Sequence, residues 1–425
     1  MESQGPDLVP TRSAEPHRST HTSVDTSTEP PLEASRRAPP AENGGGLLGY
    51  RGLVNTFGVF QSYYEDRLLS SYSSSSISWI GTVQGFLLLV VGVVVGPLFD
   101  RGYVSSLIAI GTFLVVFGLM MTSLSTEYYQ IFLAHGVAVG MGCACVFLPS
   151  VAVVATYFTT HRALAMGITA AGGSTGATIY PIMFHRLVGT LGFPWTTRVI
   201  AFVVLSGLAF SLAVMRVRAA TIKPKKSIFD FAALKEPAFC VFCLGLFFTF
   251  VGLYFPFFYL PDFFASFLHS DNNIAFYSIS IINATSALGR ISPGFLADRI
   301  GAINTMLPIT VMVSVLAFAW IGIRNEPGTI VFTCLYGFAS GAVISLQPTI
   351  VAALSPGLDA VGARLGVSFL FAGLGLLIGN PIAGTLLDLH EATFWKAQIF
   401  SASTVTVGTV FFAQLFLIKW KRASD

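Results

Sequence analysis

Hydrophobic residues fill most of this chain in blocks of about 20, separated by short polar connections. A helix of about 20 residues rises about 30 Å, the thickness of the hydrocarbon core of a bilayer. The pattern predicts twelve membrane-spanning helices, the first of them unusually short. Their expected positions are 46–65, 77–99, 104–124, 130–157, 162–188, 198–216, 238–262, 273–297, 303–323, 329–353, 362–387 and 396–418. We therefore expect an all-α polytopic membrane protein.

Composition supports the same class. The chain is 53% hydrophobic and 11% charged, whereas soluble domains are charged at about a quarter of their positions. All five cysteines lie inside apolar blocks, where they act as small apolar fillers rather than as a disulfide framework. No nucleotide motif, metal-ligand cluster or nucleophile–base arrangement is visible. We expect neither enzyme activity nor a cofactor, and no nucleic-acid partner.

Polar segments divide the chain into five parts. Residues 1–43, rich in Ser, Thr, Pro and charged residues, predict a disordered N-terminal tail, and 419–425 a short C-terminal tail. Between them we expect a first six-helix half at 44–216, a linker at 217–237 and a second six-helix half at 238–418. The basic linker predicts a cytoplasmic location, because cytoplasmic connections carry an excess of Lys and Arg. Both termini are then cytoplasmic.

The two predicted halves carry the same landmarks in one register. Each landmark in the first half recurs 198 to 202 residues later. The pairs are Asp100 with Asp298, Pro149 with Pro348, Arg162 with Arg364, and Pro181 with Pro381. Two parallel six-helix halves are the layout of major facilitator transporters, whose substrate site lies near the midplane between the halves.

Two related motifs lie about one repeat apart. GPLFDRGY at 96–103 and GRISPGFLADRIG at 289–301 both place Gly, Asp and Arg at the end of a predicted span. They resemble the major facilitator signature and its second copy. The resemblance implies a gating role for Gly96, Asp100, Arg101, Asp298 and Arg299. The alternative is that these charges only fix the topology.

The stretch YFTTHRALAMGITAAGGSTGATIYP, at 157–181, has the glycine density of a phosphate-binding loop. It has no lysine and continues a helix-length apolar run, so a nucleotide site is excluded. Small residues at these spacings instead allow membrane helices to pack closely. The stretch resembles the corresponding segment of the monocarboxylate porter family, and the matching positions include Arg162, Gly167, Gly172 and Gly176.

Further segments strengthen this resemblance and give it a fungal character. They are NTFGVFQSYYE (55–65), SSISWIGTVQGFLLL (75–89), GLYFPFFYLP (252–261) and GNPIAGTLLD (379–388). The resemblance covers about residues 42–420 and implies transport of a small organic acid or related metabolite, often with a proton. Asn55 and Ser286, however, stand where proton-linked animal members carry a lysine and an aspartate. Proton coupling is therefore left open.

The first span is also short by comparison with the family, because ENGG at 42–45 precedes Val54 by only a few residues. Either its cytoplasmic end is irregular or a coding segment is missing. The short first span also allows a third interpretation, a protein that no longer transports.

The predicted substrate site centres on Arg290. Asn283, Ser286 and Arg290 are spaced to share one helical face, and a guanidinium can bind a carboxylate bidentately. The alternative is an arginine paired with a helix end or a carbonyl. Asn55 and Tyr254 complete the predicted set. Gln84, His135, Gln347 and Asn380 are further polar candidates inside spans, although hydrogen bonds between helices are their commoner use.

These observations predict a secondary active transporter of a small organic acid or related metabolite that works by alternating access. Export of a fungal secondary metabolite competes with uptake of a nutrient or vitamin. A non-transporting sensor, or an inactive relative, is the alternative from another class. The expected partners are a small-molecule substrate and the lipid bilayer. We expect a monomer in the plasma membrane.

Overall fold

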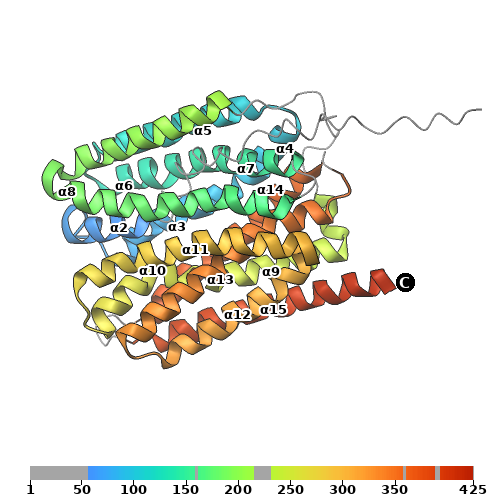
Figure 1. Ribbon diagram of the computed structural model, residues 1–425. Helices are drawn as coiled ribbons and strands as arrows, with labels where there is room; N and C mark the ends of the chain where they lie inside the picture. Colours follow the sequence, from blue (N-terminus) through green and yellow to red (C-terminus); the bar gives the residue numbers. More distant parts are fainter. Residues whose placement is uncertain (1–55, 158–160, 215–230, 358–359, 388–392, 425) are drawn as a thin grey trace, which may run out of the picture. The chain divides into compact units, whose positions relative to one another are not determined.

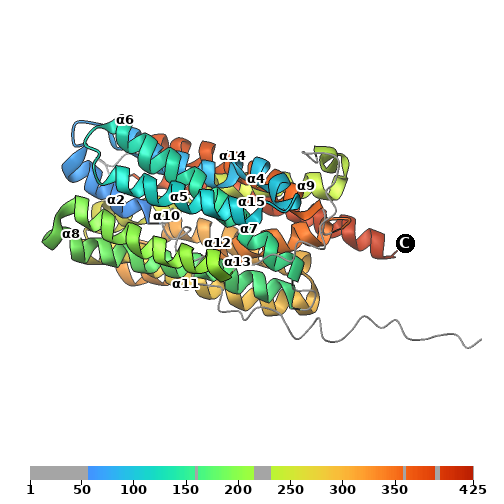
Figure 2. The same cartoon turned by 90° about the horizontal axis from the view of Figure 1, so that it is seen from above.

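The computed structural model describes residues 56–157, 161–214, 231–357, 360–387 and 393–424. These residues belong to one compact unit, Pro39–Asp425, in which helices run side by side (Figures 1 and 2). The predicted N-terminal tail, the start of the first span and most of the linker lie outside the described residues.

Helices account for the regular structure of both halves. The first half contains α2 (Phe57–Tyr63), η3 (Tyr64–Leu68), α3 (Ser74–Val90), α4 (Gly92–Asp100), α5 (Val104–Thr122), α6 (Tyr128–Ile131), η4 (Phe132–Ala138), α7 (Val139–Tyr157) and α8 (Arg162–Val214). The second part of the chain contains η5 (Phe231–Lys235), α9 (Pro237–Leu253), α10 (Phe255–Asp262), η6 (Phe263–Phe267), α11 (Asn272–Ile300), α12 (Ala302–Ala319), η7 (Trp320–Gly322), α13 (Glu326–Leu354), α14 (Val361–Leu386) and α15 (Trp395–Ser424).

The described residues contain ten helical segments that are long and apolar enough to cross a membrane. One of them, α8, holds two predicted spans, because its backbone leaves the helical region at Gly192, where φ is 72° and ψ is 169°. Spans five and six are thus two helical arms that meet at a glycine rather than helices separated by a loop. Glycine tolerates this positive φ without a steric penalty. The α2–η3 segment is the described part of the first span.

Large apolar side chains are exposed on the long helices, where a soluble protein would present polar residues. Phe113 on α5 is 65% exposed and Leu288 on α11 is 63% exposed. Phe202, Phe295, Val315 and Val331 are also exposed. Apolar surface on this scale is stable in contact with lipid and not in contact with water. The predicted membrane fold is confirmed.

The predicted internal repeat is visible in the secondary structure. The first span ends in the π-helical turn η3, which begins at Tyr64. The equivalent π-helical turn η6 follows α10 and begins 199 residues later, at Phe263. The ends of α4 and α11 also correspond, because each is followed by a glycine with positive φ, Gly102 at 89° and Gly301 at 95°. These glycines turn the chain from one helix into the next.

Helices of the first half pack against helices of the second along two seams. At one seam α8 contacts α11, and at the other α14 contacts α3 and α4. Additional contacts join α8 to α13 and α7 to α14. Asp100, Asp298 and Arg290 lie along these seams.

Two segments that the sequence places outside the spans are partly helical. Helix α15 continues past residue 418 to Ser424, so the predicted C-terminal tail begins as helix. The end of the predicted linker forms the short 3-10 helix η5, directly before α9.

Candidate functional site

Asp100 lies at the end of α4 and contacts the first turn of α14. Its Oδ1 accepts a hydrogen bond from the main-chain N–H of Gly362 at 3.1 Å, and its Oδ2 accepts one from that of Ala363 at 2.8 Å. The first N–H groups of a helix have no partner within the helix, and the positive end of the helix dipole favours a negative charge there. We call this set of contacts the first latch.

Asp298 makes the equivalent contacts between the other pair of helices. It lies near the end of α11, and its two carboxylate oxygens accept hydrogen bonds from the N–H groups of Ala163 at 2.9 Å and Leu164 at 3.1 Å, in the first turn of α8. We call this the second latch. The two latches are related by the internal repeat, and each joins one half to the other.

Glycines allow the helices of each latch to approach. A Cβ atom at Gly96 would collide with the carbonyl oxygen of Gly362, and one at Gly362 would collide with Asp100 itself. At the second latch a Cβ atom at Gly294 would lie 2.8 Å from the Cα of Leu164. Larger residues would separate the helices and move each carboxylate away from its N–H partners.

The arginines of the two motifs lie beside the latches. Arg101 follows α4 directly and is exposed, and Arg299 lies exposed in the last turn of α11. The structure thus brings together Gly96, Asp100 and the first turn of α14, while the two arginines face outward from the packed helices.

Arg290 is fully buried on α11 at the seam with α8. Its Nη1 donates a hydrogen bond to the carbonyl oxygen of Ala170 on α8 at 2.8 Å. Gly167 lies against the same residue, because a Cβ atom there would collide with the carbonyl oxygen of Arg290. In this conformation the guanidinium therefore joins the two halves through a carbonyl, as in the second of the two alternatives that the sequence offers.

Ser286 packs against α13, and Asn283 forms a hydrogen bond within α11. A Cβ atom at Gly341 of α13 would lie 2.8 Å from the Ser286 hydroxyl, so this hydroxyl faces α13 rather than α8. The Asn283 amide donates to the carbonyl oxygen of Ile279 in its own helix at 2.9 Å. The predicted polar face of α11 is buried, with Arg290 bonded to α8 and the Ser286 hydroxyl next to α13.

The remaining predicted residues are spread over the bundle. Tyr254 lies at the junction of α9 and α10, with ring centroids 5.8 Å from Phe250 and 5.5 Å from Phe257. Arg162 begins α8, which also carries Gly172 and Gly176. Asn55 lies outside the described residues.

Several buried amides lack a hydrogen-bond partner in the described part of the chain. Gln84 on α3 is fully buried with both amide atoms unpaired, and Gln347 on α13 and Asn380 on α14 each have an unpaired amide nitrogen. A buried polar group without a partner costs about 1–3 kcal/mol. Such groups are candidates for contact with a polar substrate or with water.

His135 and Tyr64 form a polar contact that the sequence showed only in part. The Tyr64 hydroxyl and His135 Nδ1 are 2.9 Å apart, and both side chains are fully buried. Tyr64 lies in η3 and His135 in η4, so the contact joins two π-helical turns, a feature that is frequent at functional sites. The sequence singled out His135 but offered no signal for Tyr64.

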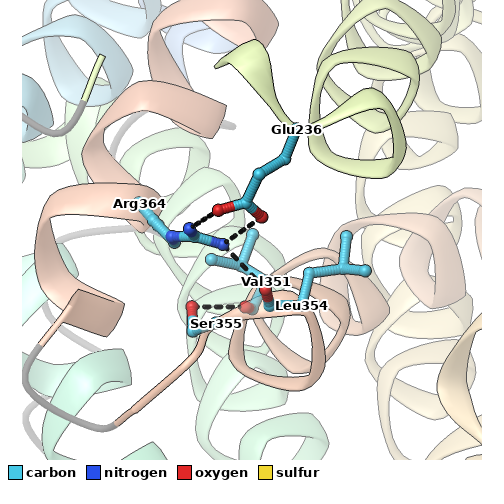
Figure 3. A network of polar contacts seen from close by, with 5 residues as sticks. All are labelled: Glu236, Val351, Leu354, Ser355 and Arg364. Atoms are coloured by element: carbon cyan, nitrogen blue, oxygen red, sulfur yellow. Dashed lines mark hydrogen bonds and ion pairs between the residues drawn. The ribbon is translucent and has the colours of Figure 1, made fainter. Parts of the chain in front are cut away.

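A second polar network, at the start of α14, includes Glu236, which the sequence alone does not single out. Arg364 donates through Nη1 to Glu236 Oε2 at 3.1 Å and to the carbonyl oxygen of Leu354 at 2.7 Å, and its Nη2 forms an ion pair with Glu236 Oε1 (Figure 3). The sequence marks Arg364 only as a landmark of the repeat. Glu236 could have been noticed as an acidic residue near the end of the basic linker.

Comparison with known proteins gives one family and several close relatives. The family model described as "Major Facilitator Superfamily" matches residues 46–356. The MFS-type transporter dbaD of Emericella nidulans is 38% identical over 399 residues, covering 89% of this chain and 89% of the relative. The agnestins efflux protein AgnL12 of Paecilomyces divaricatus is 41% identical, covering 85% and 82%. The aspyridones efflux protein apdF of Emericella nidulans is 40% identical, covering 86% and 74%.

Solved structures of transporters share the fold. The human organic anion transporter MFSD10 superposes with a TM-score of 0.67 at 16% identity, covering 88% of this chain and 100% of that chain. The Escherichia coli fucose:proton symporter FucP gives a TM-score of 0.66 at 13% identity, covering 88% and 98%. At these identities the likeness concerns the fold alone.

Proposed function

The chain belongs to the Major Facilitator Superfamily, and from this premise we propose that it exports a small organic acid or weakly acidic secondary metabolite by alternating access. The single observation that carries the mechanism is the pair of repeat-related latches that join the two halves. Their hydrogen bonds can form only while α4 touches α14 and α11 touches α8. Release of both latches would let the halves separate at this end.

The direction of transport rests on the named relatives. Two of them, each at least 40% identical to this chain, are efflux proteins, one for agnestins and one for aspyridones.

The latches lie at the cytoplasmic end in our proposal. Arg101 and Arg299 follow them, and the basic linker reaches the same end before α9. Under the positive-inside rule this end faces the cytoplasm, as do both termini. The conformation described here is then closed toward the cytoplasm. We assign the protein to the plasma membrane as a monomer.

Within the superfamily we place the chain among the monocarboxylate porters. The glycine-rich segment that resembles that family begins α8, and Gly167 of this segment contacts the backbone of Arg290. The segment therefore acts as a packing surface against the helix that carries the predicted anion-binding residue. Asn55 and Ser286 replace the ionisable pair of proton-linked members, so any proton coupling in this chain uses other groups.

Arg290 is the proposed partner of the anionic group of the substrate. It is a cation buried at the seam between the halves, where a transporter of this architecture binds its substrate. In the closed conformation its Nη1 bonds to Ala170, and separation of α8 from α11 would release that donor. Ser286, Asn283, Tyr254 and Asn55 complete the proposed substrate site.

The test is untargeted mass spectrometry of cells and medium from matched strains of the producing organism with and without the gene. Export predicts a compound that is retained in the deletion strain and lost from its medium. A compound left unconsumed in the medium would instead show uptake, and unchanged pools would contradict transport.

Complementation then tests the site. We expect Arg290→Ala to lower efflux of that compound roughly tenfold or more, because the variant lacks the cation that we propose binds the anionic group of the substrate. Arg186→Ala, which removes an exposed arginine of α8, is the matched control and should restore efflux. If Arg290→Ala reaches the membrane in normal amount and restores efflux fully, Arg290 does not bind the substrate.

A further inference from the structure

Three helices of the second half meet at the side chain of Arg364. The residue lies in the first turn of α14, its ion-pair partner Glu236 directly precedes α9, and its carbonyl partner Leu354 ends α13 (Figure 3). The guanidinium carbon also lies 5.3 Å from the centroid of the Phe239 ring on α9. The position of the first turn of α14 therefore depends on both neighbouring helices.

The Arg364–Glu236 ion pair differs from a surface ion pair because the arginine is buried. The Arg364 side chain is 2% exposed, whereas the Glu236 side chain is 52% exposed. Exposed ion pairs contribute little because water screens them, but a buried cation that loses its counter-charge is costly. Removing the Glu236 charge would thus weaken the charge compensation of the buried Arg364 at the start of α14.

The same turn of α14 supplies the N–H groups of the first latch. Gly362 and Ala363 immediately precede Arg364, and both donate to Asp100 of the first half. On one side this turn is held by Asp100, and on the other by Glu236 through Arg364. A shift of the turn would change both hydrogen-bond distances of the latch at once.

We propose that Glu236 is a positioning residue for the first latch, which acts through Arg364 by holding the first turn of α14 where both N–H groups reach Asp100. Glu236 follows η5 directly, so the end of the linker between the two halves is coupled to closure of the latch end. The inference rests on the proposed gating role of Asp100.

The test measures how often the latch end opens. Thr349 on α13 is buried, and its hydroxyl contacts the sulfur of Met166 on α8 at 3.1 Å, so a cysteine at this position reacts with a maleimide only when the halves separate. The reporter Thr349→Cys is placed in the full-length chain with its five native cysteines changed to serine. Labelling by a water-soluble maleimide is followed over time in membrane vesicles that expose the latch end.

Four variants are compared with the parent reporter. Glu236→Gln should raise the labelling rate roughly three- to tenfold, as should Asp100→Asn. The double variant should label no faster than the faster single variant, because both changes disable the same latch. Lys235→Gln, which changes the charge of the exposed neighbouring residue, should leave the rate unchanged.

Other results would overturn the proposal. A parent-like rate in Glu236→Gln, effects of Glu236→Gln and Asp100→Asn that multiply, or an equal effect of Lys235→Gln would each show that Glu236 does not act through the latch. A parent-like rate in Asp100→Asn would instead contradict the gating role of Asp100 itself. If Glu236→Gln is not recovered as a monodisperse protein, Glu236→Asp takes its place, with the same non-additivity expected.

Discussion

At the scale of single residues, the chain places ionic groups where main-chain groups need partners. Asp100 and Asp298 each bond two N–H groups of a helix that starts in the other half. The sequence identified both aspartates because they recur in one motif. It could not identify Gly362, Ala363, Ala163 or Leu164 as partners, because a main-chain N–H group is common to almost every residue type.

The hydrogen bond between Tyr64 and His135 gives a prediction about the stability of the fold. Tyr64→Phe removes the hydroxyl that bonds His135 Nδ1, while His135 Nε2 already lacks a partner in the described part of the chain. Because the imidazole would then be buried without hydrogen bonds, we expect the variant to lose about 1–3 kcal/mol of stability. The measurement is the temperature at which purified protein in detergent loses its monodisperse elution.

The control for this prediction is Tyr63→Phe. Tyr63 is the half-buried neighbour, and its ring stacks on Phe193 with centroids 5.0 Å apart, a contact that phenylalanine preserves. An equal loss of stability in both variants, or no loss in Tyr64→Phe, would show that the Tyr64–His135 hydrogen bond does not stabilise this part of the fold.

At the scale of helices, hydrophobic periodicity was sufficient for the type and approximate bounds of most elements. It predicted spans 104–124 and 329–353, and the structure gives α5 as Val104–Thr122 and α13 as Glu326–Leu354. The turn at Gly192 was not predicted in this form, because a single glycine with positive φ can replace a polar loop. The π-helical turns η3, η4 and η6 were not predicted either, since they change the hydrogen-bond register without a distinctive sequence pattern.

The sequence also could not show which neighbour each polar side chain of α11 faces. Spacing places Asn283, Ser286 and Arg290 on one side of a helix, but it does not show that α8 and α13 both pack against α11. Arg290 reaches α8 because its side chain is long, whereas the short Ser286 side chain stays next to Gly341. Pairing of this kind depends on the tertiary arrangement.

Helix contact at the first latch gives a second prediction. Gly96→Ala places a methyl group against the carbonyl oxygen of Gly362, so α4 and α14 must separate. Overpacking of this kind typically costs about 1–3 kcal/mol, and here it acts on the closed conformation. We expect faster maleimide labelling of the Thr349→Cys reporter and weaker export.

Gly189→Ala is the matched control, because a Cβ atom at Gly189 meets nothing within 4 Å. This variant should label and export like the parent protein. If Gly96→Ala behaves in the same way, close approach of α4 and α14 is not required for closure.

At the scale of the whole molecule, the internal repeat links fold and function. Repeated landmarks in the sequence correspond to repeated helix ends, repeated π-helical turns and two related latches. Because each latch joins opposite halves, both must open together if the halves move as units. In the proposed mechanism these contacts hold one end closed and leave the other end free to open, as alternating access requires.

The most direct test of this account is a pair of distance measurements by double electron–electron resonance on protein in lipid nanodiscs. Spin labels at Tyr103 and Ile300 report the latch end, and labels at Glu127 and Arg324 report the opposite end; all four positions are exposed. When Asp100 and Asp298 are both changed to asparagine, we expect a longer latch-end distance together with a shorter distance at the opposite end. Unchanged distances, or lengthening at both ends, would contradict alternating access controlled by the two latches.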